Sequence, residues 1–322
     1  MFASVTEILI YVIIAVISYY TLDYIFIRRL TNLPGPKTWP VLGNYPLLWH
    51  HIEPLNMMLR FAEEYSSPFH FWLGSNLFIG IYDPQQAQAI LHDRNCLDKS
   101  IIYKLFKPLF GMGLFTAPAS IWTRLRKISA RTFRPSILQD FFKIFVEESD
   151  KLTNELNENT NEGEEIILID IITQYAWKMA CRTMMGIKLG QEKNKKYVKA
   201  IQRCKNNFTY RIKNILLFFD GTFSITAMGR KQKKDMDFIN SLGDEMIQQL
   251  KHDHNNPNTT DGNNRTHTTF YQILMAASQD MNFTDKDFHD NIMTMLVTAS
   301  DTISAVINFV TFILANFPEI QV

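Results

Sequence analysis

The chain begins with an apolar segment long enough to cross a lipid bilayer. Residues 8–22 contain only a serine and a threonine as polar interruptions. As a helix, this run and its apolar flanks cover roughly 30 Å at about 1.5 Å per residue. The alternatives are a cleaved signal peptide and a buried core helix. A signal peptide would have basic residues before the run, whereas Glu7 precedes it and Arg28 and Arg29 follow it. We therefore expect an uncleaved transmembrane anchor over residues 1–27, with the rest of the chain in the cytoplasm.

Residues 28–50 form a proline-rich connector. Its prolines fix φ and bias the residues before them toward extended backbone. A generic linker is the alternative, but the apolar residues of the connector argue for packing against a folded domain. They are Leu33, Trp39, Val41 and Leu42. We therefore expect a stiff hinge between anchor and body.

From residue 51 onward, the hydrophobic spacing predicts a mainly α-helical body with a small β-sheet. Two apolar runs, 69–73 and 77–82, flank Gly74-Ser75-Asn76, which is typical of a hairpin. Asp83 followed by Pro84 indicates the start of a helix. Helical patterns are expected at 56–65, from 84 onward, and at 119–131, 135–157, 168–186, 193–219, 231–252, 267–278 and 285–316. Residues 252–266 have almost nothing to bury and predict a surface loop.

The last predicted helix, 285–316, contains an acidic residue in an apolar setting. Thr284 can cap its N-terminus, and residues 293–314 are apolar nearly all round. Such a helix runs through a core or a membrane. Asp301 lies near its middle, and a central Asp costs about 2.5–3.5 kcal/mol on the membrane-insertion scale. A buried core helix is therefore favoured.

The neighbouring Asp301 and Thr302 have two readings. In the first, Thr302 donates to a carbonyl one turn earlier while Asp301 pairs with a cation elsewhere in the core. In the second, the two form a proton relay beside a buried reactive centre. Burial raises the pKa of a carboxyl group toward neutrality, and an adjacent hydroxyl can pass the proton on.

Composition narrows the classes of function. Thirty-three Lys and Arg against 32 Asp and Glu give a net charge of +1, so nucleic acid is not an expected partner. Aromatic residues make up 13% of the chain. We therefore expect a large packed interior with room for a flat or lipophilic ligand. The three cysteines, at positions 96, 181 and 204, are too widely spaced for a CxxC metal site or a disulfide framework. That usage is typical of a reducing compartment.

Thr298-Ala299-Ser300-Asp301-Thr302 resembles the oxygen-activation motif in the central helix of the cytochrome P-450 superfamily, the haem-thiolate monooxygenases. The other landmarks stand in the family's order: the anchor, the Leu33-Pro34-Gly35-Pro36 hinge, the hairpin, and a Trp-x-x-x-Arg pair on one helix face. The resemblance implies that Trp122 and Arg126 hold a haem propionate, and that Asp301 and Thr302 deliver protons. The candidates to line the substrate site are Phe106, Phe110, Met112, Leu114 and Phe115, although aromatic residues at helical spacing are also typical of plain core.

Finer details look most like the microsomal family 4 branch. Among them are Gly111-Met112-Gly113-Leu114-Phe115-Thr116 and Asn316-Phe317-Pro318-Glu319-Ile320-Gln321. That branch is associated with fatty acids and other lipophilic substrates. It often carries a Glu, able to form an ester with haem, where this chain has Thr298. Covalent attachment of haem by that route is therefore not expected.

The resemblance covers essentially all 322 residues, but the chain stops just after the central helix. No Glu-x-x-Arg pair occurs in it, and no cysteine is followed two residues later by the glycine of the family's iron-ligand loop. The iron-ligating Cys is thus absent from this chain. We expect an incomplete cytochrome P-450 domain over residues 51–322, from an incomplete gene model, a splice product or a pseudogene. The last helix should leave an apolar face uncovered.

The resemblance implies a haem-dependent monooxygenase of the endoplasmic reticulum membrane, with one N-terminal span and a cytosolic body. Its substrates would be lipophilic (fatty acids, hormones or xenobiotics), its oxidant O2, and its electron donor NADPH-cytochrome reductase. The chain as written is not expected to form a haem-thiolate centre or to be active. The alternative is a non-catalytic, membrane-tethered helical fragment that binds a lipid or a protein partner.

Overall fold

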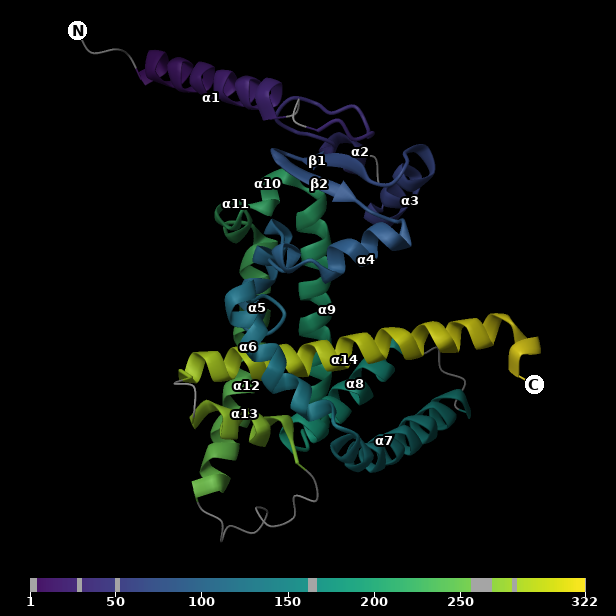
Figure 1. Cartoon of the computed structure of the whole chain (residues 1–322). Helices are drawn as coiled ribbons and strands as arrows, with labels where there is room; N and C mark the ends of the chain where they lie inside the picture. Colours follow the sequence, from purple (N-terminus) through teal and green to yellow (C-terminus); the bar gives the residue numbers. More distant parts are fainter. Residues whose placement is uncertain are drawn as a thin grey trace. The chain divides into compact units, whose positions relative to one another are not determined.

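The computed structural model describes residues 5–27, 31–49, 53–161, 167–255, 268–279 and 283–321 (Figure 1). The chain divides into two compact units. The first is Met1–Leu97 with Asn207–Gly229, and the second is Asp98–Asn206 with Arg230–Val322. Helices make up most of both units, and the described part of the chain has one two-stranded sheet. The predicted mainly helical fold with a small sheet is confirmed. The predicted boundaries 1–27, 28–50 and 51–322 stay predictions.

The first unit begins with the apolar helix α1 (Val5–Ile27). Over Val5–Leu22 it is long and apolar enough to cross a membrane, and none of that stretch is buried against the rest of the chain. α1 is therefore a candidate membrane span, as the sequence predicts. Arg28 and Arg29, on which the predicted orientation depends, lie outside the described residues.

A hairpin and two short helices build the core of the first unit. Strands β1 (Phe69–Leu73) and β2 (Asn76–Gly80) pair antiparallel, with Phe71 opposite Phe78. α2 (Tyr45–Trp49) and α3 (Pro54–Glu64) supply the other apolar side chains. The buried cluster comprises Tyr45, Leu48, Met57, Phe61, Phe69, Phe71 and Leu73. The sheet is thus covered by aromatic and aliphatic residues from elements close in sequence.

The connector lies along β1 and is held there by its backbone. The His70 amide donates to the Pro34 carbonyl at 2.8 Å, and the Trp72 amide donates to Oδ1 of the buried Asn44 at 2.8 Å. Trp39 and Val41, which were expected to pack against the body, are exposed. The connector therefore docks through backbone hydrogen bonds along β1 and through the buried Tyr45 and Leu48 near its end.

Two predictions of helix ends fall in the first unit; one is confirmed and the other is wrong. The Asp83 carboxylate accepts from the Gln86 amide at 2.9 Å and caps α4 (Pro84–His92), as predicted. The helix predicted over 193–219 is wrong beyond Lys213, where α9 (Gln191–Lys213) ends and α10 (Ile215–Phe218) and α11 (Asp220–Ser224) follow. The buried guanidinium of Arg211 binds the carbonyls of Leu217 and Phe218, which a continuous helix would not expose to it.

The second unit is a helical assembly around α14 (Asp285–Asn316). Its other helices are α5 (Lys107–Phe110), α6 (Ala119–Ser129), α7 (Pro135–Asn161), α8 (Leu168–Ala180), α12 (Ala227–Asn255) and α13 (Phe270–Gln279). α8 continues as a π-helix over Cys181–Met185. Residues 252–255 of the predicted loop extend α12, and 256–266 lie outside the described residues. α8 packs along α14 (Figure 1), and Trp177 of α8 stacks on Tyr197 of α9 with ring centroids 3.5 Å apart.

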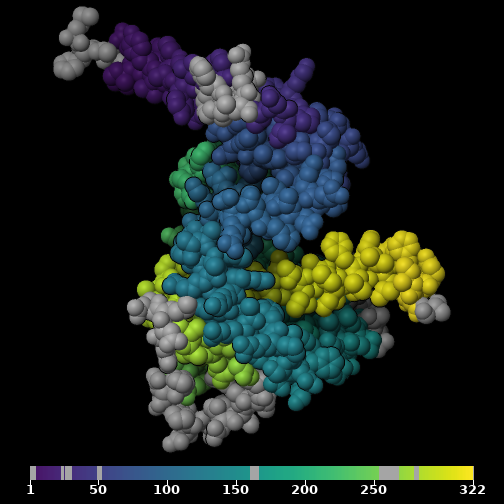
Figure 2. All heavy atoms as spheres, in the orientation of Figure 1, coloured from purple at the N-terminus to yellow at the C-terminus, as the bar shows by residue number. Residues whose placement is uncertain are grey.

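The two halves of α14 have different surroundings. Its start has the predicted cap, a capping box in which Thr284 and Asp287 satisfy each other's backbone amides. Residues 290–297 are buried without a break, and Ser300 and Ser304 are the last buried residues, whereas Val306, Phe309 and Phe312 are exposed. The C-terminal part of α14 is the yellow segment in Figure 2. The prediction of a buried core helix therefore holds for the first half only, because α5, α8 and α13 contact that half. The predicted uncovered apolar face is present on the second half. By length and composition, α14 also qualifies as a membrane span.

Candidate functional site

A cavity of about 410 Å³ lies in the second unit beside the middle of α14. We call it the α14 cavity. Its walls come from α6, α7, the end of α8 with the π-helix, and the loop between α5 and α6. The lining is mainly apolar and comprises Leu114, Arg126, Phe133, Leu138, Phe141, Phe145, Met179, Ala180, Thr183, Met184, Met295, Thr298, Ala299, Thr302 and Ile303. Segments far apart in the sequence thus line one mainly apolar cavity.

Arg126 is the one charged residue among those lining residues. It sits on α6, one turn after Trp122, so the predicted pair does share a helix face. Trp122 does not line the α14 cavity. Its half-buried ring instead faces Lys99, with Nζ 5.9 Å from the ring centroid. Of the two residues, Arg126 borders the cavity and Trp122 does not. Their assignment to a haem propionate stays a prediction.

A series of threonines along α14 reaches the cavity. The hydroxyl of Thr294 donates to the Asp290 carbonyl at 2.7 Å, that of Thr298 to the Thr294 carbonyl at 2.6 Å, and that of Thr302 to the Thr298 carbonyl at 2.9 Å. Thr298 and Thr302 line the cavity. Each hydroxyl therefore returns its hydrogen to the helix one turn earlier, as the first reading of Thr302 expects.

Asp301 lies beside this series but does not border the cavity. Its side chain is 40% exposed and forms an ion pair with Lys205 of α9. The burial that the proton-relay reading assumes is therefore absent in this structure. Pairing with a cation agrees with the first reading, but the pair is partly exposed and does not lie in the core, as that reading expects. The relay stays a prediction that requires Asp301 to leave Lys205.

The predicted substrate residues divide between two environments. Leu114 lines the α14 cavity. Phe106, Phe110 and Phe115 instead pack against one another, with ring centroids 5.3–6.4 Å apart. Met112 lies between them and α14, where its amide binds a side chain described below. Contact of these five residues with substrate stays a prediction, and Leu114 is the one placed at this cavity.

Neither cysteine of the second unit supplies a thiolate. Cys181 begins the π-helix and is fully buried, which raises the pKa of its thiol well above the ordinary value. Burial, reinforced by the charge of Asp235, raises the pKa of Cys204 to about 12. Both are therefore protonated thiols near neutral pH, and neither lines the α14 cavity. Cys96, in the first unit, is exposed.

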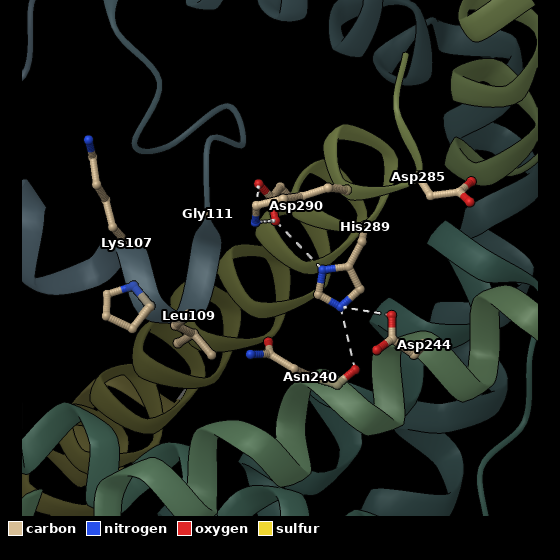
Figure 3. Close-up of a pocket in the computed structure, with 10 residues that line it drawn as sticks. Lys107, Leu109, Gly111, Asn240, Asp244, Asp285, His289 and Asp290 are labelled. Carbon is tan, nitrogen blue, oxygen red and sulfur yellow. Dashed lines mark hydrogen bonds and ion pairs between the residues drawn. The ribbon is translucent and has the colours of Figure 1, made fainter.

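The second unit has another cavity, polar and about 380 Å³, at the start of α14 (Figure 3). We call it the His289 pocket. The His289 ring lies between two carboxylates, with Nε2 3.5 Å from Asp244 and Nδ1 3.7 Å from Asp290, and Nε2 also approaches the Asn240 carbonyl at 3.4 Å. Sequence reasoning did not find this cluster, because its members come from α12 and α14 and match no motif.

The charges of this pocket shift two pKa values. Burial alone lowers the pKa of His289, but the hydrogen bond with Asp290 and the charge of Asp244 outweigh burial, so the net pKa is raised. Burial alone raises the pKa of Asp290, but hydrogen bonds from His289 and the Met112 amide, with the charge of Lys286, lower it overall. The histidine thus favours its cationic form and the aspartate its anionic form.

Comparison with known proteins identifies relatives along almost the whole chain. The family model described as Cytochrome P450 matches residues 33–322. Cytochrome P450 4c21 of Blattella germanica is 28% identical over an alignment of 321 residues that covers 96% of this chain and 64% of that protein. Cytochrome P450 4V2 of Homo sapiens is 26% identical over 86% of this chain and 56% of its own length. Cytochrome P450 4d10 of Drosophila mettleri is 25% identical, with shares of 91% and 60%. The chain therefore spans 56–64% of the length of these relatives.

Proposed function

Because the chain belongs to the cytochrome P450 family, we propose that its α14 cavity accommodates haem in a membrane-bound monooxygenase of lipophilic substrates. The predicted resemblance to the family 4 branch is confirmed by the relatives, and the proteins of this family bind haem. One observation carries the proposal. The cavity brings Arg126 of α6 together with Thr298 and Thr302 of α14, the same motifs that the sequence singled out.

The lining of the α14 cavity fits part of a haem group. Its apolar walls suit a flat hydrophobic ring, and the Arg126 guanidinium suits a propionate carboxylate. The lining contains neither Cys nor His, so it supplies no thiolate for a haem-thiolate centre, and its sulfur atoms are the thioethers of Met179, Met184 and Met295. The described residues thus fit the ring and one carboxylate.

In this proposal, each residue has a defined task. Arg126 neutralises a propionate and orients the ring, and Trp122 assists from the same helix face. The apolar walls exclude water from the reacting atoms. Thr302, once its hydroxyl leaves the Thr298 carbonyl, passes its proton into the cavity. Asp301, after it releases Lys205 and takes up a proton from solvent water, returns a proton to the Thr302 oxygen. Haem, when bound, supplies the activation of O2 for insertion of one oxygen atom into a substrate.

The wider setting follows from α1 and the relatives. We propose that α1 anchors the protein in the endoplasmic reticulum membrane with the body in the cytosol, and that NADPH-cytochrome reductase donates electrons. Fatty acids, hormones or xenobiotics would enter from the bilayer. The mainly apolar cavity lining supports a lipophilic substrate.

A second candidate function rests on the same lining. An apolar cavity with a single guanidinium at its border also suits a fatty acid, whose carboxylate pairs with Arg126. The chain would then bind a lipid without catalysis. The two candidates differ in whether haem or a fatty acid is the preferred occupant of the α14 cavity.

The deciding experiment is a haem titration of the detergent-solubilised full chain. We expect saturable binding by Soret absorbance, weakened about tenfold or more in Arg126→Ala, because a charge-assisted pair is lost. Arg124→Ala is the matched control, since Arg124 is exposed on the same helix and does not line the cavity. Equal affinity of wild type and Arg126→Ala would refute the proposal.

Two further measurements test the ligation of the iron and the occupant of the cavity. The reduced, carbon monoxide-treated protein should lack the red-shifted Soret band of thiolate ligation, because the buried thiols are protonated. Palmitate that binds in an Arg126-dependent way, in a protein that does not take up haem, would favour lipid binding. Palmitate that fails to bind in either state would exclude the second candidate.

A further inference from the structure

The loop between α5 and α6 approaches α14 so closely that two of its positions have no room for a side chain. Gly111 has φ +54°, and a Cβ atom on it would overlap the carboxyl group of Asp290. A Cβ on Gly113 would overlap the Thr294 hydroxyl and the Asp290 carbonyl. The Gly111-Met112-Gly113 segment therefore depends on glycine for contact with α14 rather than for flexibility.

A single side chain of α14 fixes this loop by a hydrogen bond. Asp290 is buried, with 5% of its side chain exposed, and its Oδ2 accepts from the Met112 amide at 2.8 Å. Lys286 approaches both carboxylate oxygens at 3.3 Å. Nδ1 of His289 lies 3.7 Å from Oδ1 (Figure 3). Lys286 and His289 thus compensate the buried negative charge of Asp290, and one carboxylate oxygen accepts the hydrogen bond from the loop.

The loop is closed upon itself around this point. The Thr116 hydroxyl donates to the Gly111 carbonyl at 2.7 Å, and the Ala117 amide donates to the Gly113 carbonyl at 2.9 Å. Leu114, which lines the α14 cavity, stands inside this closed turn, two residues after the amide that Asp290 holds. A short, hydrogen-bonded segment therefore connects the Asp290 carboxylate to Leu114.

We propose that Asp290 is a positioning residue that fixes the 111–117 loop against α14 and thereby sets how far Leu114 limits the α14 cavity. Asp290 itself touches no ligand. Its effect is on the size of the ligand that the cavity admits, so that loosening the loop relaxes discrimination between short and long apolar chains. This inference rests on the proposed function insofar as the α14 cavity is the ligand site.

The first test measures the loop alone, by hydrogen–deuterium exchange of the detergent-solubilised full chain. In Asp290→Ala, the peptide containing Met112 should exchange about tenfold faster or more, because the charge-assisted bond to its amide is lost. Asp290→Asn keeps an acceptor oxygen and should lie between Ala and wild type. Asp244→Asn is the matched control, because Asp244 also faces His289 but its exposed carboxylate makes no bond to the loop.

The second test measures size discrimination by displacement of a fluorescent fatty-acid probe with octanoate and stearate. The ratio of the two affinities should shift by about threefold or more in Asp290→Asn, and remain that of wild type in Asp244→Asn. Faster loop exchange with an unchanged ratio would overturn the proposal, as would unchanged exchange. If Asp290→Ala is recovered only as aggregate, Asp290→Asn carries the comparison. A wild type that binds the probe but no haem would count against the haem function while leaving this test decisive.

Discussion

Two adjacent glutamates of α7 provide a sharp test of how burial controls the strength of an ion pair. Arg182, in the π-helix after α8, donates to Glu148 through Nη1 and to Glu147 through Nη2, both at 2.6 Å. The side chain of Glu148 is 5% exposed and that of Glu147 is 56% exposed, with Arg182 at 13%. Lys151 also binds Glu148 at 2.8 Å. The two carboxylates thus share one partner and distance but differ in solvent access.

We predict that Glu148→Ala destabilises the second unit by about 2–3 kcal/mol. Breaking a buried ion pair costs about 3–5 kcal/mol, because the partner is left buried and uncompensated. We expect a smaller cost here because Arg182 keeps its second partner, Glu147, and because Lys151 is 56% exposed and can be solvated by water. Glu147→Ala should cost about 0–1 kcal/mol, as exposed pairs do.

The assay is thermal unfolding of the solubilised full chain, followed by far-UV circular dichroism. At about 2–4 °C per kcal/mol for a unit of this size, Glu148→Ala should lower the melting temperature by roughly 4–12 °C. A loss in Glu147→Ala equal to or larger than that in Glu148→Ala would refute the reasoning. The π-helix also places Thr183 and Met184 at the α14 cavity, so Glu148→Ala should weaken haem binding as well.

The pH dependence of Glu148 gives an independent check. Burial alone raises its pKa, but the hydrogen bonds from Lys151 and Arg182 outweigh burial and lower it below the ordinary value of 4.5. A carboxylate with a lowered pKa contributes stability above the unfolded-state pKa, and that stability is lost as pH falls through the folded-state pKa. The difference between wild type and Glu148→Gln should therefore be full at neutral pH and vanish well below pH 4.5.

Three further predictions concern the second unit and the cysteines. Gly113→Ala should cost about 1–3 kcal/mol of stability, because the loop has no space for a Cβ against α14, and an unchanged melting temperature would contradict that contact. A maleimide should label the exposed Cys96 in the native chain and spare the buried Cys181 until denaturant is added, so equal labelling rates would show that Cys181 is accessible. His289→Gln should destabilise more at about pH 6 than at about pH 9: the raised pKa means that the stabilising charge is complete below about pH 6.5 and lost as pH rises through the folded-state value. A cost independent of pH would mean that the flanking carboxylates do not hold the cation.

Sequence reasoning succeeded where the controlling interactions are local. The Asp83 cap, the Thr284 capping box and the hairpin each depend on residues within a few positions of one another. Their energies come from backbone groups that any chain must satisfy at a helix end or a turn. Composition and periodicity are therefore enough to place them.

It failed where a distant residue decides the outcome. Lys205 of α9, far from α14 in the sequence, pairs with Asp301 and holds its carboxylate away from the cavity. An apolar helix pattern cannot indicate which half will be covered, as the second half of α14 shows. These features depend on tertiary partners that local propensity does not specify.

The candidate site was predicted in part. Motif spacing found Arg126 and Thr302, and both line the α14 cavity. Met179 and Met184 complete its wall, but as apolar residues in a helix they are indistinguishable from core before the fold is known. The glycine pair at 111 and 113 was a usable signal of close approach, although only the structure identifies Asp290 as what they approach.

The threonine series of α14 determines which hydrogen-bonding character the cavity wall presents. A hydroxyl group has one hydrogen and two lone pairs, and in Thr298 and Thr302 the hydrogen is committed to a helix carbonyl. The groups that remain available on these two hydroxyl oxygens are therefore lone pairs, which accept hydrogen bonds. A water molecule or ligand at this wall must bring its own N–H or O–H to the threonine oxygen. In the resting arrangement, this wall selects donors.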